Sequence, residues 1–341
     1  MSLVFKKIIK PFIFLFSLIS IPSNGGIVFY SPSNFSQFFS LSFLLKTKVN
    51  ISIFFFFIFS IFILIIQSIY THNLINLAKF LIVFGGISFA VNIKNNKDLN
   101  LYKKIFFIYL SLELLIRILL IDKDYLGSIY FLKHSSSIAV DSNFIGALIV
   151  SALLGNIENN NKSNKSILIL IFFLILTFSR TFYILLILYL LTVRYRFFSI
   201  ILLIGFILFI IYLSQNQEFA RSLDGSLLTK AIIVDLFYEI MVFDFSFLFG
   251  YGRENIELLS YKFSSQDMFY NGHSIFGFIS RDGFLFFLIF FIMNLYFFNT
   301  YSKTKYLIPI CFTTVGFVSL WPVSYFGVIA IVYLIFNKSN N

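Results

Sequence analysis

Residues 49–70 read VNISIFFFFIFSIFILIIQSIY, a run without a single charged side chain. An α-helix needs roughly 20 consecutive apolar residues to cross the hydrocarbon core of a bilayer. The stretch therefore predicts a transmembrane helix. Such a helix is apolar all round, so it must be surrounded by other apolar groups, from lipid or from protein.

Comparable apolar stretches recur along the whole chain. Together they predict helices over 5–22, 27–45, 49–70, 73–92, 101–121, 137–155, 166–179, 181–193, 197–213, 274–298, 306–320 and 323–336. The chain is 59% hydrophobic and only 12% charged, well below the roughly 25% charged residues of soluble domains. We therefore expect an all-α polytopic integral membrane protein with about 12 transmembrane helices, forming a single domain over residues 1–341.

The lysines and arginines predict the orientation. With the N-terminus in the cytoplasm, 16 of the 26 cationic residues fall in inside loops and 7 in outside segments, the bias expected of cytoplasmic loops. An even number of crossings then places both termini in the cytoplasm. The net charge of +11 comes from short clusters between apolar runs, so we expect membrane lipids and no nucleic acid as partners.

One long segment, residues 214–272, interrupts the apolar pattern. It holds 8 of the 15 acidic residues and is predicted to be a large external loop. Within it, residues 226–243 predict an amphipathic or interfacial helix, and Gly250-Tyr-Gly252 predicts a turn after that helix.

Arg180 is the most informative cation, because an ionisable group at membrane depth is costly and suggests function. The apolar run on each side is short for a full crossing, so Arg180 lies either in a tight turn between two short helices or deep within one long helix. The cationic clusters beyond both runs favour two crossings. The pattern predicts two helices joined by a tight external turn, with Arg180 at its mouth. The alternative is an arginine that snorkels to lipid headgroups.

Other polar residues occupy comparable positions at the external ends of predicted spans. His273 follows a glycine at the start of the span 274–298 and can serve as a general base, or else contact headgroups. Asp141 and Asn143 open another span, where helix capping is the simpler role. Arg281 and Asp282 predict an ion pair.

Four short motifs resemble, in order, those of the Wzy-type O-antigen polymerases, within the O-antigen polymerase and ligase superfamily. They are Asp141-Ser-Asn143-Phe-Ile-Gly-Ala, Leu176-Thr-Phe-Ser-Arg180-Thr181, Phe247-Leu-Phe-Gly250-Tyr-Gly252, and Asn271-Gly-His273-Ser-Ile-Phe ten residues before Gly283. The first lacks the family's proline, and in the last a serine replaces the asparagine after histidine. The match covers mainly residues 137–298.

The resemblance implies a glycosyltransferase that polymerises undecaprenyl-diphosphate-linked oligosaccharide repeat units at the periplasmic face of the bacterial inner membrane. Arg180, Arg253 and Arg221 are the expected diphosphate ligands. Lys230 stands where the family often has arginine, so it keeps the charge but loses the bidentate fork. His273 is the expected catalytic base, with Asp141 and Asn143 positioning substrate.

No P-loop, dinucleotide fingerprint or zinc-protease motif is present in the sequence, so we expect no cofactor and no metal. The same four motifs also fit an O-antigen ligase. A flippase or transporter of the lipid-linked unit is a third reading, although its polar residues should line several spans near mid-bilayer. A capsule polymerase, a structural subunit and a separate chain-length regulator that binds the external loop all stay open.

Overall fold

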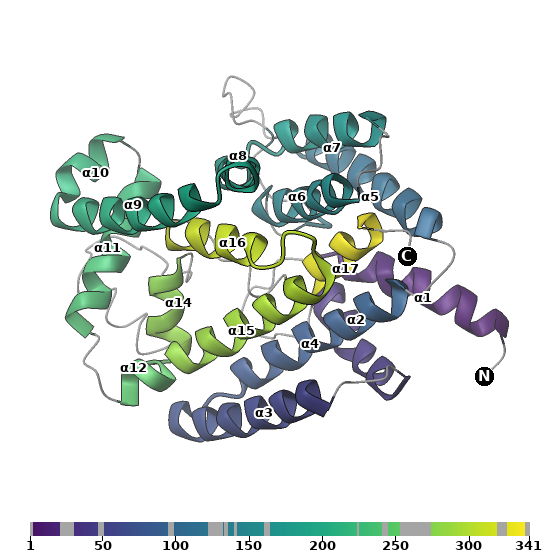
Figure 1. Cartoon of the computed structure of the whole chain (residues 1–341), viewed down its shortest axis with the longest axis horizontal. Coiled ribbons are helices and arrows are strands. Elements are labelled where there is room, and N and C mark those ends of the chain that lie inside the picture. The colour runs from purple at the N-terminus through teal and green to yellow at the C-terminus, as the bar shows by residue number, and fades with distance from the viewer. Residues whose placement is uncertain are drawn as a thin grey trace. The chain divides into compact units, whose positions relative to one another are not determined.

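The computed structural model describes residues 3–20, 31–46, 51–94, 99–121, 132, 136–139, 142–159, 164–223, 225–240, 245–252, 274–318 and 326–337. Within these ranges the chain is helical and contains no strand (Figure 1). The residues fall into two compact units, each gathered from distant parts of the sequence. The first comprises Met1–Ile51, Ala78–Tyr183 and Val323–Asn341, and the second comprises Ser52–Leu77 and Ile184–Pro322.

The first unit contains eight helical elements in whole or in large part, besides the first residues of α8. They are α1 (Leu3–Leu18), α2 (Pro32–Phe39), a 3-10 helix (Ser40–Lys46), most of α4 (Ile75–Lys94), α5 (Leu99–Leu119), α6 (Ser142–Glu158), α7 (Asn164–Leu176) and α17 (Phe326–Phe336). Its centre is the pairing of α6 with α17. A Cβ at Gly155 would lie 2.6 Å from the carbonyl oxygen of Tyr333, so this close helix contact requires a glycine.

The second unit contains most of α3 (Ile51–Thr71), most of α8 (Arg180–Arg194), α9 (Arg196–Gln215), α10 (Gln217–Leu223), α11 (Gly225–Ile240), α12 (Phe245–Phe249), α14 (Ile275–Asp282), α15 (Phe284–Tyr301) and α16 (Leu307–Val318). Helices α10 and α11 pack against α9 (Figure 1). Leu213 of α9, Val234 of α11 and Phe276 of α14 share one apolar cluster. The first part of the predicted loop 214–272 is therefore folded, and the predicted helix 226–243 corresponds to α11.

Three helices in the described part of the chain are long and apolar enough to cross a membrane. They contain Ile53–Thr71, Ile75–Ile93 and Phe284–Tyr301, while the other apolar helices are shorter. This agrees with a helical membrane protein. The full number of crossings and the external position of the loop 214–272 stay predictions.

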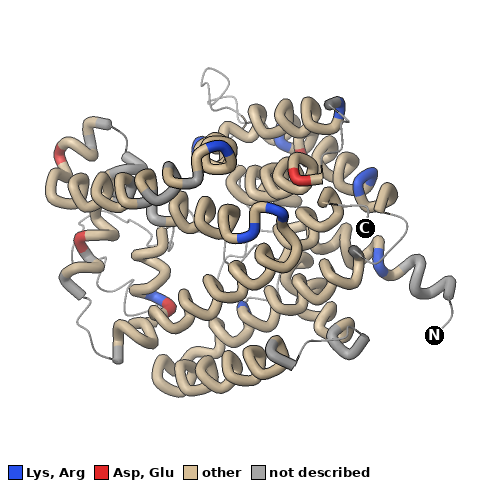
Figure 2. The backbone as a smooth tube through the Cα atoms, in the orientation of Figure 1, with Lys and Arg blue, Asp and Glu red and all other residues tan. Residues whose placement is uncertain are grey.

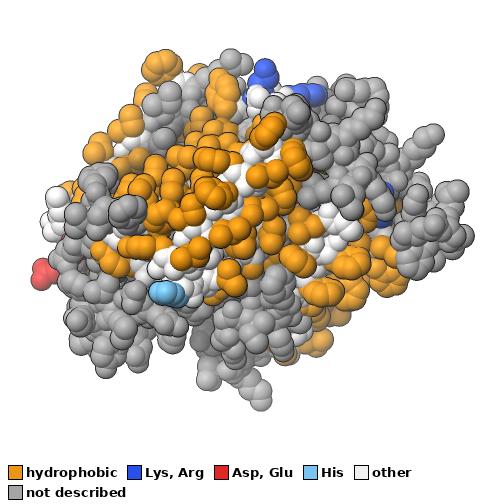
Figure 3. Space-filling view, turned by 90° about the horizontal axis from the view of Figure 1, so that it is seen from below, with side chains coloured by type: hydrophobic (Ala, Val, Ile, Leu, Met, Phe, Trp, Pro, Cys, Tyr) orange, Lys and Arg blue, Asp and Glu red, His pale blue; other side chains and the backbone are white. Residues whose placement is uncertain are grey.

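The surface of α3 illustrates this apolar character. Its exposed side chains include Phe54, Phe55, Ile58, Phe59, Phe62, Ile65, Ile66 and Ile69. Figure 2 shows how thinly charged residues are spread along the described backbone, and hydrophobic side chains predominate among the described atoms of the face in Figure 3. Water is a poor solvent for such a surface, and lipid a good one.

Two predicted spans differ from the structure. Residues 32–46, which overlap the predicted span 27–45, form the eight-residue α2 followed by a seven-residue 3-10 helix. The predicted span 274–298 is broken at Gly283, where α14 ends and α15 begins. Gly283 has a φ of +88°, which lies outside the helical region. Glycine adopts such a value without steric cost.

Candidate functional site

The turn that carries Arg180 connects α7 to α8. Helix α7 ends at Leu176, and Phe178 takes a φ of +50°, a left-handed conformation rare for a bulky residue. The carbonyl of Ser179 accepts the first backbone hydrogen bond of α8, from Phe182 at 3.1 Å. Two helices separated by a tight turn are what the sequence predicted here, and Arg180 is exposed as the first residue of α8.

The same turn is fastened to the start of α6. The hydroxyl of Ser179, which is fully buried, donates to the amide oxygen of Asn143 at 2.7 Å. One turn further along α6, a Cβ at Gly146 would lie 2.8 Å from the ring of Phe182 and 3.2 Å from the Cβ of Ser179. A glycine at 146 therefore allows α6 to approach the start of α8, and two of the four motifs meet within the first unit.

Replacing Ser179 by alanine should destabilise this contact. The amide oxygen of Asn143 would lose the donor that now satisfies it, at a cost of about 1–3 kcal/mol. Thermal unfolding of the purified protein in detergent measures the effect. Thr300→Ala is the matched control, because its exposed hydroxyl bonds to a carbonyl within its own helix. Equal melting temperatures for the two variants would contradict the prediction.

Within the second unit, the motif Gly250-Tyr-Gly252 meets the end of α14, the helix that follows His273 in the sequence. The backbone N–H of Tyr251 donates to the carbonyl of Ser280 at 2.9 Å, and that of Gly252 donates to the carbonyl of Arg281 at 3.1 Å. In an unbroken helix those two carbonyls would accept bonds from residues 284 and 285. The segment after α12 thus takes over acceptors that the break at Gly283 releases, as apolar surroundings require.

This backbone crossing is possible only because two glycines face each other. A Cβ at Gly250 would lie 2.5 Å from the carbonyl oxygen of Arg281, and a Cβ at Gly283 would lie 2.4 Å from the carbonyl carbon of Phe249. Both glycines also have positive φ values, +83° and +88°. Any other residue at either position would strain the backbone and collide with it.

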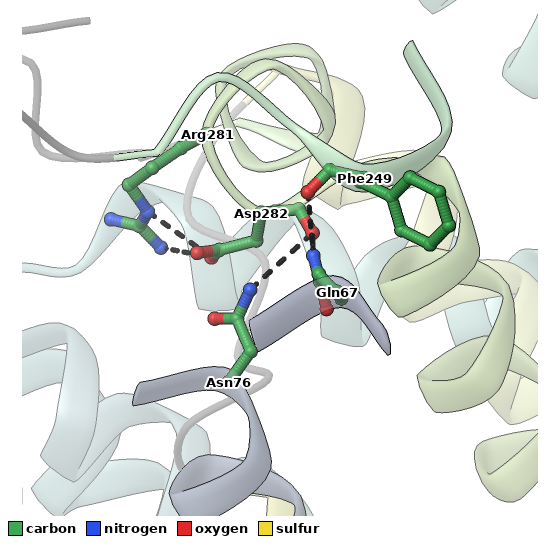
Figure 4. A network of polar contacts seen from close by, with 5 residues as sticks. All are labelled: Gln67, Asn76, Phe249, Arg281 and Asp282. Carbon is green, nitrogen blue, oxygen red and sulfur yellow. Dashed lines mark hydrogen bonds and ion pairs between the residues drawn. The ribbon is translucent and has the colours of Figure 1, made fainter. Parts of the chain in front are cut away.

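A polar network from α3 and α4 supports the crossing (Figure 4). The buried amide nitrogen of Gln67 donates to the carbonyl of Phe249 at 2.6 Å and also to the carbonyl of Asp282. Asn76 lies on the other side of the α3–α4 turn, with its amide nitrogen 3.4 Å from the Asp282 carbonyl. The network therefore joins the turn between α3 and α4 to both crossing segments, the one at Phe249 and the one at Asp282.

Arg281 and Asp282 form the predicted ion pair. The Nε and Nη2 atoms of Arg281 lie 3.1 and 2.6 Å from one carboxylate oxygen of Asp282. The arginine side chain is 19% exposed and the carboxylate 6%. Each charge is compensated by its neighbour, so the pair adds little net charge to the site.

Substituting Gln67 by leucine should release the crossing from α3. Two backbone carbonyls would lose a donor in apolar surroundings, which we expect to cost about 1–3 kcal/mol. The melting temperature in detergent measures the loss, and Gln215→Leu, at an exposed position near the end of α9, is the control. A melting temperature for Gln67→Leu as high as that of the control would show that the two bonds contribute nothing.

The predicted site residues divide into three groups. The structure brings Asn143 against Ser179 beside Arg180. Arg221 lies in α10 and Lys230 in α11, where the backbone alone is described. Asp141, Arg253 and His273 lie outside the described residues. Just after His273, the Ser274 hydroxyl caps α14 by accepting from the Gly277 N–H at 3.3 Å.

Our sequence reasoning missed Gln67 and Asn76. Both are neutral, and the search for polar groups at membrane depth considered mainly ionisable ones. An amide with four hydrogen-bonding sites inside the apolar run 51–70 is itself such a signal, because its donors must find partners.

Comparisons with protein-family models, with curated proteins and with solved structures found no match for this chain.

Proposed function

We propose that this protein is a glycosyltransferase that polymerises undecaprenyl-diphosphate-linked oligosaccharide repeat units into a surface polysaccharide of the O-antigen type. In this proposal it is a multi-pass protein of the bacterial inner membrane, with both termini in the cytoplasm and its site at the periplasmic face. Its substrate is the lipid-linked oligosaccharide.

The observation that carries the proposal is that described parts of the motif regions meet in pairs, one pair within each unit. The motif with Asn143 meets the motif with Ser179 and Arg180 through a side-chain hydrogen bond. The motif with Gly250 meets the helix that follows His273 through two backbone hydrogen bonds. Motifs that carry function should be built into the tertiary structure in this way, whereas chance matches in apolar sequence need not touch.

Contacts between distant segments also support the predicted topology. Six of them join residues that the topology places toward the same side of the membrane. Toward the outer side they are Ser20–Ile138, Asn143–Ser179 and Gln67–Asp282, and toward the inner side Lys10–Asn92, Glu158–Tyr333 and Thr192–Cys311. An incorrect alternation of crossings would pair outer with inner positions, while the assignment of the inner side rests on the lysine and arginine bias alone.

In the proposed reaction the acceptor is the non-reducing-end hydroxyl of a new lipid-linked unit. Its oxygen bonds to the anomeric carbon of the growing chain, while the bond from that carbon to the diphosphate breaks. The hydroxyl proton passes to the imidazole of His273, and undecaprenyl diphosphate leaves. Because the leaving group is already activated, the protein must supply alignment, a base and charge stabilisation, with no nucleotide and no metal.

The position of Arg180 supports a role in charge stabilisation. It is exposed at the first residue of the 15-residue helix α8, so the guanidinium stands at the positive end of the helix dipole. Arginine also binds phosphate oxygens with two parallel hydrogen bonds. Arg253, Arg221 and Lys230 are the further proposed diphosphate ligands.

Deletion of the gene in its host separates the candidate functions. A polymerase deletion should leave lipopolysaccharide capped by a single repeat unit, because the ligase still transfers one unit. A ligase deletion should leave no repeat on the core, and a flippase deletion should trap the lipid-linked unit on the cytoplasmic side. A full-length ladder in the deletion strain would rule the proposal out, and plasmid-borne wild type must restore the ladder.

A further inference from the structure

A buried ion pair lies within α5, outside the four motifs. The Nε of Arg117 donates to a carboxylate oxygen of Glu113, one helical turn earlier. Arg117 is 2% exposed and Glu113 is 4% exposed. Because α5 matches the predicted span 101–121, the pair occupies the half of the span nearer the predicted outer face.

Stability alone does not explain the pair. Taking two charges out of water is costly, and apolar residues of similar volume often stabilise a protein as well or better. The pair is also incompletely satisfied, because Arg117 Nη2 and the nearby hydroxyl of Tyr109 are buried without a hydrogen-bond partner among the atoms that the structure describes. A half-satisfied polar group at membrane depth suggests a role other than stability.

That role follows from the third nitrogen of the guanidinium. Arg117 Nη1 donates at 2.9 Å to the carbonyl of Leu132, a buried residue in the connection between α5 and α6. Glu113 holds Nε, so the planar fork directs Nη1 at this carbonyl. A lysine has one nitrogen and no fixed fork, so it cannot reproduce both contacts with this geometry.

The same connection is attached a second time, closer to α6. The N–H of Ser20, just after α1, donates to the carbonyl of Ile138 at 3.0 Å. The hydroxyl of Ser136 accepts from the N–H of Ala139 at 3.0 Å and closes a turn. Helix α6 begins three residues after Ala139, at Ser142, and Asn143 is its second residue.

We propose that Arg117, oriented by Glu113, is a positioning residue for the site around Asn143 and Arg180. It fixes the backbone that leads into α6, and so places the amide of Asn143 against Ser179. The expected effect of Arg117 on polymerisation rests on the proposed function. The attachment of the connection to α5 is a property of the fold.

The test uses the full-length protein and two variants. Arg117→Lys keeps the charge without the fork, and the double variant Glu113→Leu with Arg117→Met removes both charges at similar volume. Lys104→Met is the control, because Lys104 is an exposed cation on the same helix. In the double variant no buried charge is left unpaired and only the Leu132 carbonyl loses its donor, so the melting temperature in detergent should fall no further than the loss of one hydrogen bond allows.

Amide hydrogen exchange over residues 136–143 is the first readout, and it does not depend on activity. Both variants should raise the exchange rate of this segment at least about tenfold, while α17 and the Lys104→Met control stay at the wild-type rate. Unchanged exchange in both variants would overturn the proposal, whatever the enzyme does.

A double-mutant cycle with Asn143→Ala is the second readout. If Arg117 acts through Asn143, the charge-free variant and Asn143→Ala should each slow polymerisation by on the order of 10- to 100-fold. The combined variant should be no slower than the slower of the two. Multiplied effects would overturn the positioning role. A wild-type protein without polymerase activity would refute the proposed function and the catalytic part of this inference. The exchange result would still decide whether Arg117 attaches the connection between α5 and α6 to α5.

Discussion

Gly283→Ala and Gly250→Ala should prevent the protein from accumulating in a folded form. A left-handed backbone conformation costs a residue with a Cβ about 1–2 kcal/mol. Overpacking adds about 1–3 kcal/mol. The collision here is with backbone atoms at 2.4–2.5 Å, and no rotamer change relieves it. Size-exclusion elution in detergent and melting temperature measure the result.

Two other glycines provide graded controls for that experiment. Gly205→Ala meets no atom within 4 Å on a helix surface and should not destabilise the protein. Gly252→Ala also meets no atom within 4 Å but has a φ of +79°, so it should show the conformational cost alone. If Gly283→Ala is as stable as Gly205→Ala, the described crossing of the two segments is wrong.

Arg180→Ala should lower the polymerisation rate by about 10²–10³-fold, the usual effect of removing one group that stabilises developing charge. The side chain is exposed, so the melting temperature should stay close to that of wild type. Arg180→Lys should retain part of the rate, because it keeps the charge and loses the bidentate geometry. The ladder of surface polysaccharide in the complemented deletion strain measures all three proteins.

Arg194→Ala is the matched control for that prediction. Arg194 is an exposed arginine at the opposite end of the same helix, which the predicted topology places at the cytoplasmic side. It should support a normal ladder. A normal ladder from a folded Arg180→Ala variant would remove Arg180 from the site.

Hydropathy predicted most helices because each apolar stretch is a local signal. Residues 49–70 and 73–92 correspond to α3 and α4 within a few positions. Arg180 lies between two short apolar runs, and this local pattern was enough to predict the turn between α7 and α8. The predicted pair Arg281–Asp282 is likewise local and is present in the structure.

The break at Gly283 could not be predicted in the same way. A single glycine in an apolar run is tolerated in many membrane helices, so residues 274–298 look continuous. At the break, the segment around Gly250, more than thirty residues earlier, approaches the helix, and the N–H groups of Tyr251 and Gly252 donate to the freed carbonyls of Ser280 and Arg281. The contact of Gln67 with Phe249 spans 182 positions and is equally invisible to a pattern of neighbours.

Reconstituted polymerisation tests the central claim most directly. The purified protein is placed in vesicles with the lipid-diphosphate-linked single repeat unit extracted from the deletion strain, in the presence of a metal chelator. We predict a ladder of lipid-linked oligomers and release of undecaprenyl diphosphate with wild-type protein and with Arg194→Ala, and at least about a hundredfold less with Arg180→Ala. Failure of the folded wild-type protein to extend the repeat unit, or an equal ladder from Arg180→Ala, would contradict the account.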